Sequence, residues 1–124
     1  MVICHIRRTS NGVKIAISST GEGLTSKVSE VFARCPYFII VDIENQEIKK
    51  FEAIKNESEN QMSGAGISAA QLMAEKNVKA VITGNIGPRA LDVLNQFNIE
   101  IYYGSDTADK VLEKFIEGKL EKMN

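Results

Sequence analysis

Two consecutive segments of the chain share one layout, in which a helix-forming stretch ends at an asparagine and leads into a short apolar strand and a glycine. They read AEKNVKAVITG and LNQFNIEIYYG, and an amphipathic stretch, TADKVLEKFIEG, follows the second. Strands that alternate with helices in this way are typical of parallel sheets. The repeat therefore predicts an α/β fold whose last two strands run parallel.

The first half of the chain adds three predicted strands. The run VKIAIS, residues 13–18, has the continuous apolar character of a buried strand. The runs YFIIVDIE and EIKKFEAI flank Asn45 and Gln46, a short polar turn that indicates a hairpin. Charges separate the apolar residues of the second run, which favours an exposed edge strand. With a short helix predicted over Val28–Ala33, the whole chain is read as a single-domain, five-stranded mixed sheet with helices on both faces.

Three later helices are predicted after residue 64. Their boundaries carry residues of the kinds that begin or end helices: Asn77, Pro88, Asn98, Asp106 or Thr107, and Gly118.

The predicted topology brings four irregular segments to one edge of the sheet. Ligands of open α/β sheets bind outside the carboxyl ends of parallel strands. If the strand that begins at Tyr37 runs antiparallel to the first strand, its start lies at that same edge. The edge then collects the loop 19–23, Cys35, the loop 55–66 and the segment 83–88.

Two glycine-containing turns at this edge precede predicted helices and are candidate ligand-binding loops. Free backbone N–H groups at a helix start favour an anion, and glycine lets a ligand come close to the backbone. Such turns also occur simply as tight connections, so a structural role and a binding role both stay open. The candidate residues are Ser63, Gly64 and Gly66 in SGAG, and Gly84, Asn85 and Gly87 in TGNIGP.

Cys35 is the candidate metal ligand. It follows Arg34, whose positive charge favours the thiolate, and it precedes Pro36 at the start of a strand. Free cysteine is also among the most buried residue types, so a packing role is the alternative. Cys4 and His5 are sequence neighbours, and neighbours on a strand point to opposite faces, which makes them a poor chelating pair.

The charge balance and the absence of a long apolar run argue against two classes of function. The chain has 15 Lys and Arg against 16 Asp and Glu, a formal net charge of −1, so it is not built to neutralise many nucleic-acid phosphates. No run approaches the ~20 apolar residues of a membrane span. The N-terminal order of charged and apolar residues is wrong for a secretory signal. We therefore expect a cytoplasmic protein with reduced thiols.

Three motifs, in order, resemble a known family. The segments SEVFARCPYF, GAGISAA and GNIGPRAL are similar to motifs of the dinitrogenase iron–molybdenum cofactor biosynthesis family, which comprises small NifX-like proteins and the C-terminal part of NifB. The resemblance runs from Val13 to Leu120. It implies a family domain over residues 13–120, an N-terminal extension over residues 1–12, and a ribonuclease H-like fold whose second strand is antiparallel.

The resemblance implies a non-catalytic protein that binds or carries an iron–sulfur or iron–molybdenum type of metallocluster, or its precursor. Its partners would be cluster donor or acceptor proteins, and the chain would be a monomer or a weak homodimer. Val31 and Ser63 stand where the family often has histidine, so both usual nitrogen ligands are missing. Cys35 is the one matching ligand that remains, and a single thiolate cannot hold a four-ligand cluster.

A module that binds an anion or small metabolite and has lost the cluster role is the alternative. It would use the two glycine turns and would not depend on Cys35. Nuclease chemistry needs clustered carboxylates around paired metal ions, and the strands VKIAIS and VKAVITG contain none. The sequence offers Cys35 no nearby resolving cysteine, which argues against a thiol oxidoreductase. The chain is therefore not expected to be an enzyme.

Overall fold

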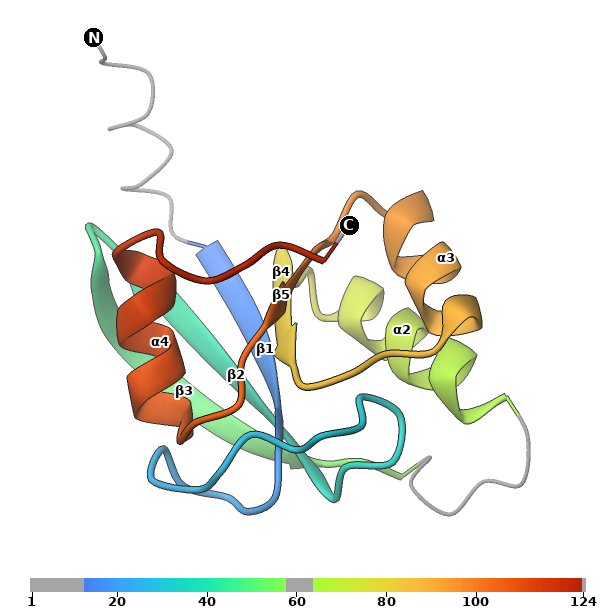
Figure 1. Ribbon diagram of the computed structural model, residues 1–124, viewed down its shortest axis with the longest axis horizontal. Coiled ribbons are helices and arrows are strands. Elements are labelled where there is room, and N and C mark those ends of the chain that lie inside the picture. Colours follow the sequence, from blue (N-terminus) through green and yellow to red (C-terminus); the bar gives the residue numbers. More distant parts are fainter. Residues whose placement is uncertain (1–12, 58–63, 124) are drawn as a thin grey trace, which may run out of the picture.

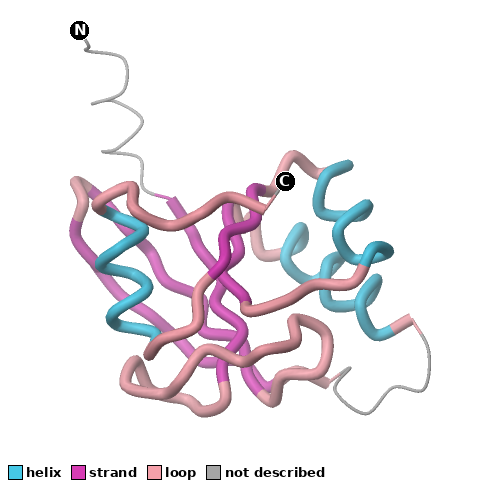
Figure 2. Tube along the Cα trace, viewed as in Figure 1, coloured by secondary structure: helices cyan, strands magenta, loops and turns pink. Residues whose placement is uncertain are grey.

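The computed structural model describes residues 13–57 and 64–123, in which five strands form one mixed sheet (Figures 1 and 2). The central strand β1 pairs in parallel with β4 and antiparallel with β2, and β5 continues the parallel half. The order across the sheet is β3-β2-β1-β4-β5. This arrangement confirms the predicted α/β fold and the antiparallel second strand. The bounds are β1 Val13–Ser19, β2 Tyr37–Glu44, β3 Glu47–Lys55, β4 Ala80–Thr83 and β5 Glu100–Tyr103.

Helices cover both faces of the sheet, as predicted. Helices α2 (Ala65–Glu75) and α3 (Pro88–Gln96) lie together on one side, and α4 (Ala108–Ile116) lies on the other (Figure 1). Each side has its own apolar core. Side chains of β1 alternate between the two, with Ala16 packed on the α2–α3 side and Ile15 and Ile17 on the α4 side.

Backbone conformations at the turns explain why asparagine and glycine stand at the predicted boundaries. Asn45 and Gln46 both have positive φ, 54° and 66°, which is the pattern of a two-residue hairpin turn that matches the strand twist. Asn77 and Asn98 end α2 and α3 in the left-handed region, with φ of 61° and 60°. Gly118 does the same just beyond α4, with φ of 75°.

The helix predicted over Val28–Ala33 is wrong. This segment forms no helix, because its backbone groups are used by neighbouring segments. The N–H of Val28 donates to the carbonyl of Asp106, and the N–H of Ser29 donates to the carbonyl of Ser18. Residues 20–36 instead form an irregular cover across the lower end of the sheet in Figure 2.

The C-terminal segment pairs with the outer side of β5. The N–H of Tyr103 donates to the carbonyl of Glu121 over 2.8 Å, and the N–H of Met123 donates to the carbonyl of Ile101 over 2.7 Å. This edge of the sheet is therefore covered by the chain itself. Within the described parts of the chain, no helix has the length and apolar character that crossing a membrane requires.

Candidate functional site

A cavity of about 340 Å³ lies where the carboxyl ends of β4 and β5 meet the segment that follows β1. This is the edge at which an open α/β sheet binds ligands. Three stretches that are distant in sequence contribute its walls. The lining residues are Lys27, Val28, Glu30, Val31, Gly84, Asn85, Tyr103, Gly104 and Ser105.

The first wall of this cavity is fixed by a close backbone crossing at Gly84. A Cβ at Gly84 would lie 2.9 Å from the Cα of Glu30 and 3.2 Å from the carbonyl oxygen of Ser29. The N–H of Gly84 donates to that same carbonyl over 3.2 Å. A glycine is required here because the segment through Ser29 and Glu30 runs directly over the end of β4.

Buried hydroxyl groups connect the ends of β1 and β4 beneath the cavity. Ser18 and Thr83 are fully buried, and the Ser18 hydroxyl donates to the Thr83 hydroxyl over 2.8 Å. Thr83 in turn donates to the carbonyl of Asn85 over 3.2 Å. The same carbonyl accepts from the N–H of Phe32 over 3.0 Å. This chain of hydrogen bonds fixes the turn after β4 against the segment before β2.

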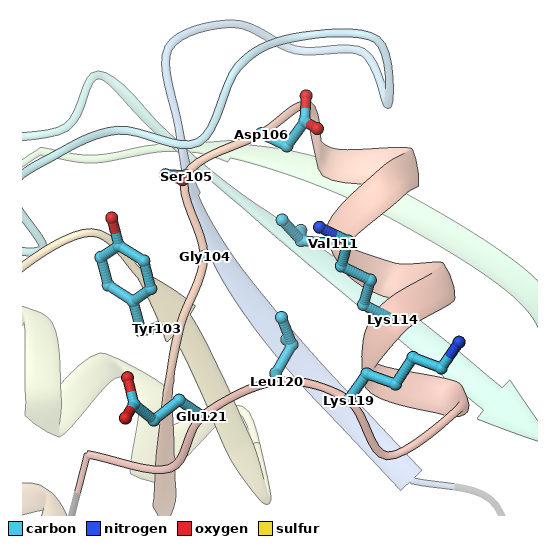
Figure 3. A pocket seen from close by; sticks show the side chains of 9 residues that line it. All are labelled: Tyr103, Gly104, Ser105, Asp106, Val111, Lys114, Lys119, Leu120 and Glu121. Atoms are coloured by element: carbon cyan, nitrogen blue, oxygen red, sulfur yellow. The ribbon is translucent and has the colours of Figure 1, made fainter.

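A second cavity of about 300 Å³ adjoins the first and shares Tyr103, Gly104 and Ser105 with it. It lies between the strand end, α4 and the C-terminal segment. Figure 3 shows Val111 and Leu120 pointing into this space, whereas Lys119 extends away from it. A Cβ at Gly104 would lie 2.6 Å from the Ile82 side chain, so a glycine is needed where α4 packs against β4.

The start of α4, by contrast, is already occupied by protein groups. The N–H groups of Ala108 and Asp109 donate to the carbonyls of Ser26 and Leu24, each over 2.8 Å. The Thr107 hydroxyl donates to the Asp109 carboxylate and lowers the pKa of that carboxyl group. Because these amides are satisfied within the chain, the first turn of α4 is not a ready anion site.

The cavity of about 340 Å³ at the ends of β4 and β5, which we call the main cavity because of its position, offers both polar and apolar contacts. The N–H groups of Asn85 and Ser105 make no hydrogen bond to the described part of the chain, so they remain available as donors. Lys27 and Glu30 place one positive and one negative charge at the lining. Val31 and Tyr103 are 45% and 44% exposed, unusually open for large apolar side chains. The surface suits a compact ligand with polar atoms and apolar faces.

The structure places the predicted glycine-turn residues in different surroundings. Gly84 and Asn85 line the main cavity. Gly64 precedes α2 with a φ of 75°, and a Cβ at Gly66 would meet Ala90 of α3 at 3.2 Å, so both positions have structural reasons for glycine. Gly87 precedes α3 and has open space around it. Ser63 lies outside the described residues, as do Cys4 and His5.

Cys35 lies in the core on the α2–α3 side, with no exposed surface. Its thiol donates to the carbonyl of Phe32 over 3.3 Å. The buried side-chain amide of Asn56 donates to the carbonyls of Ala33 and Cys35, over 2.9 and 2.8 Å, which ties this turn to the end of β3. For the thiol to contact a ligand in solution, this turn would have to move. The ligand role of Cys35 stays a prediction.

The wall formed by Tyr103, Gly104 and Ser105 was not predicted from the sequence. The signal was present, because β5 was predicted to be parallel to β4 and its carboxyl end had to reach the same edge. Val31, which stands where the resembled family often has histidine, also lines the cavity. Among the residues that the structure describes, no group of three His, Cys, Asp or Glu side chains could hold a metal ion.

The chain is similar in sequence and in fold to known proteins. Residues 13–118 match the dinitrogenase iron–molybdenum cofactor family. An uncharacterised protein of Methanocaldococcus jannaschii is 45% identical over 98 residues, which is 78% of this chain and 83% of that protein. A second uncharacterised protein of that organism is 33% identical, over 90% of this chain and 95% of the relative.

Two solved structures share the fold over most of their length. The apo form of the orange protein from Desulfovibrio gigas superposes with a TM-score of 0.80 at 28% identity, covering 89% of this chain and 92% of the other. A Thermotoga protein provisionally described as a NifB protein gives a TM-score of 0.76 at 32% identity, with coverage of 89% and 92%.

Proposed function

The chain belongs to the dinitrogenase iron–molybdenum cofactor family, and we propose that it binds or carries a metallocluster of the iron–sulfur or iron–molybdenum type, or its precursor, as cargo. The single observation that carries this proposal is the coincidence of the family match with the main cavity. The cavity lies at the carboxyl edge of the sheet and includes Val31, the position at which the resembled family often has histidine. The apo state of the orange protein is in keeping with a fold that holds a separable group.

The metal-ligating side chains among the described residues are too few to coordinate a cluster, so they fit a cargo that is held by other contacts. An iron–sulfur cluster bound by protein alone uses about four thiolates or imidazoles. The described residues have one cysteine, Cys35, which is buried, and no group of three metal-ligating side chains. The main cavity is instead lined by the polar residues Asn85 and Ser105, by Lys27 beside the carboxylate of Glu30, and by the apolar side chains of Val31 and Tyr103. Contacts of this kind suit a preassembled anionic cluster.

This function assigns no catalytic step to the chain. Its partners are the proteins that supply the cluster and receive it. The polypeptide contributes a shaped cavity that excludes part of the solvent and presents hydrogen-bond donors. Sulfide atoms of a cluster accept such hydrogen bonds, and hydrogen bonds at Gly84 and Thr83 join the cavity walls to one another.

The test is anaerobic loading of the full chain with ferrous iron, sulfide and molybdate, followed by desalting. Visible absorption and the iron, molybdenum and sulfide content per chain report retention. We expect wild type to retain a chromophore. Val31→Glu puts a carboxylate in the cavity and should reduce retention strongly. Phe97→Glu is the matched control, because Phe97 is an apolar residue of similar exposure that lies at the end of α3, outside the cavity lining.

Four outcomes decide whether the cargo binds and where it is attached. Retention that is equal in Val31→Glu and wild type would exclude the cavity as the binding place. Cys35→Ala, checked for folding by circular dichroism, distinguishes the two candidate attachments. If the chromophore disappears in a folded Cys35→Ala protein, the thiolate is a ligand. If it stays, the cavity holds the cargo without that bond. The absence of a chromophore in every variant would refute binding of a cluster assembled from these components.

A module that binds an anion or small metabolite is the second candidate, favoured by the two available amides and Lys27. It would occupy the same cavity without metal. Phosphate, citrate and sulfate, tested singly, should then raise the melting temperature of wild type, and Lys27→Gln should remove that effect. Stabilisation by these anions with no chromophore would favour this function over the cluster carrier.

A further inference from the structure

The outer side of β3 is the uncovered edge of the sheet in the described parts of the chain. Strand β3 pairs with β2 on one side only, while the opposite edge, β5, is covered by residues 121–123. Its first six residues are exposed. An edge strand of nine residues carries unpaired N–H and C=O groups that are a template for another strand.

The sequence of β3, EIKKFEAIK, is complementary to itself when it is reversed about Phe51. In an antiparallel pair of two such strands, Phe51 faces Phe51. Lys50 then faces Glu52 of the other copy, twice because of the two-fold symmetry. If the two-fold axis passed through Lys50 or through Glu52 instead of Phe51, that residue would face its own copy. Like charges directly opposite each other are unfavourable. The charge pattern therefore favours the register centred on Phe51 over the two neighbouring registers.

A β-bulge places the exposed apolar side chains of β3 on one face. Along β2, Val41 and Ile43 face the α4 side, and they pair with Phe51 and Ile48 respectively. The register shifts between Asp42 and Ile43, so Lys49 is the extra residue. Ile48 and Phe51 therefore share a face, where they are 38% and 45% exposed.

The charged residues that face each other in this register, Lys50 and Glu52, lie on the opposite face of β3. Lys50 pairs with Asp42 of its own chain, Nζ to Oδ2 at 3.7 Å, and its side chain is 76% exposed. Glu52 lies on the same face, opposite Ile40. In the two-fold pair Lys50 would lie between Asp42 of its own chain and Glu52 of the other copy. Opposite charges in such cross-strand positions stabilise a sheet. Lys50→Glu would place a negative charge between these two carboxylates and turn the attraction into repulsion.

We propose that β3 pairs antiparallel with β3 of a second copy about a two-fold axis at Phe51, joining the two sheets edge to edge. One face of the contact is apolar, with Phe51 and Ile48 of both copies. The other face carries two Lys50–Glu52 pairs. The contact is small, so the dimer is weak and its population depends on protein concentration. The cavity lies at the β4–β5 half of the sheet, so this inference does not rest on the proposed function.

Sedimentation equilibrium of the full chain over micromolar to millimolar concentrations tests the proposal. Wild type should show a reversible monomer–dimer equilibrium. Phe51→Glu should lose the dimer, because two carboxylates would meet on the axis. Phe97→Glu is the control. Phe97 is exposed at the end of α3, and its replacement by glutamate makes the same change in charge and apolar area as Phe51→Glu.

Charge exchange keeps the proposal falsifiable even if Phe51→Glu fails to fold. Lys50→Glu and Glu52→Lys should each be monomeric alone, because like charges face each other twice. An equal mixture of the two should form a heterodimer, in which every facing pair is opposite in sign. A wild type that is monomeric at all concentrations overturns the proposal. So does a dimer that survives Phe51→Glu, or a mixture of the charge variants that stays monomeric.

Discussion

Replacing Gly84 by alanine should damage the cavity wall, and the structure gives the size of the effect. The new Cβ would lie 2.9 Å from the Cα of Glu30 and 3.2 Å from the carbonyl oxygen of Ser29. Carbon atoms in contact are normally about 3.5–4.0 Å apart, so the Ser29–Glu30 backbone must move by more than half an ångström. Both neighbours are backbone, which cannot rotate away as a side chain could.

Two costs add for Gly84→Ala. Forcing an extra methyl group into a packed site costs about 1–3 kcal/mol. The displacement also strains the carbonyl of Ser29, which accepts from the N–H of Gly84 at 3.2 Å, and weakening such a bond costs about 1 kcal/mol. A total of about 2–4 kcal/mol corresponds to a fall of roughly 10 °C in Tm for a domain of this size.

Gly87→Ala is the matched control, because it changes another glycine of the same turn. A Cβ at Gly87 meets nothing within 4 Å, and the residue has an ordinary φ of −76°. The change should alter the free energy of unfolding by less than about 1 kcal/mol, since reduced freedom of the unfolded chain offsets a slightly poorer helix cap. Calorimetry on both variants makes the comparison. Equal melting temperatures for Gly84→Ala and Gly87→Ala would refute the reasoning.

Further substitutions probe two supports of the site, Asn56 and Thr83, and one titrating group, Tyr102. Asn56→Ala removes the donor to two carbonyls around Cys35 and should lower the free energy of unfolding by about 2 kcal/mol. Urea unfolding should show a lower midpoint with an unchanged slope, and an unchanged midpoint would contradict this prediction. Thr83→Val should cost about 1–3 kcal/mol because it breaks the buried hydroxyl chain, whereas Thr83→Ser should be closer to wild type in the same urea experiment. Desolvation and the hydrogen bond to Glu100 raise the pKa of Tyr102 to about 12, so its contribution to stability is complete below about pH 10 and is lost as the pH rises towards 12. Glu100→Gln should lower that pKa, seen as earlier phenolate absorption after subtraction of the Tyr102→Phe spectrum; an unmoved midpoint would show that burial alone sets it.

The sheet was predictable because its signals are local. Continuous apolar runs marked the strands, and a pair of polar residues marked the hairpin turn at Asn45 and Gln46. Asparagines ended both helices of the repeat, where the structure shows positive φ at Asn77 and Asn98. Each of these signals depends on the conformation of a few consecutive residues, and such information is present in the sequence itself.

The cavity was only partly predictable, because its walls depend on contacts between distant segments. Gly84 was singled out as a ligand-binding glycine, and the structure adds that a backbone crossing by Glu30 demands it. The segment around Val28 was assigned to a helix, yet its N–H groups bind the carbonyls of Ser18 and Asp106, which are remote in sequence. Local propensity cannot anticipate hydrogen bonds of that kind.

The placement of Cys35 bears on how a carrier could release its cargo. A thiolate bond from the core would require the turn held by Asn56 to open, so loading and unloading would both wait for a conformational change. Contacts in the main cavity impose no such step, because Asn85, Ser105 and Lys27 already line it. A protein that passes a cluster onward needs binding that is specific but reversible. Shape and hydrogen bonding at the sheet edge provide that more readily than a buried thiol, so the cavity is the better candidate for the site of transfer.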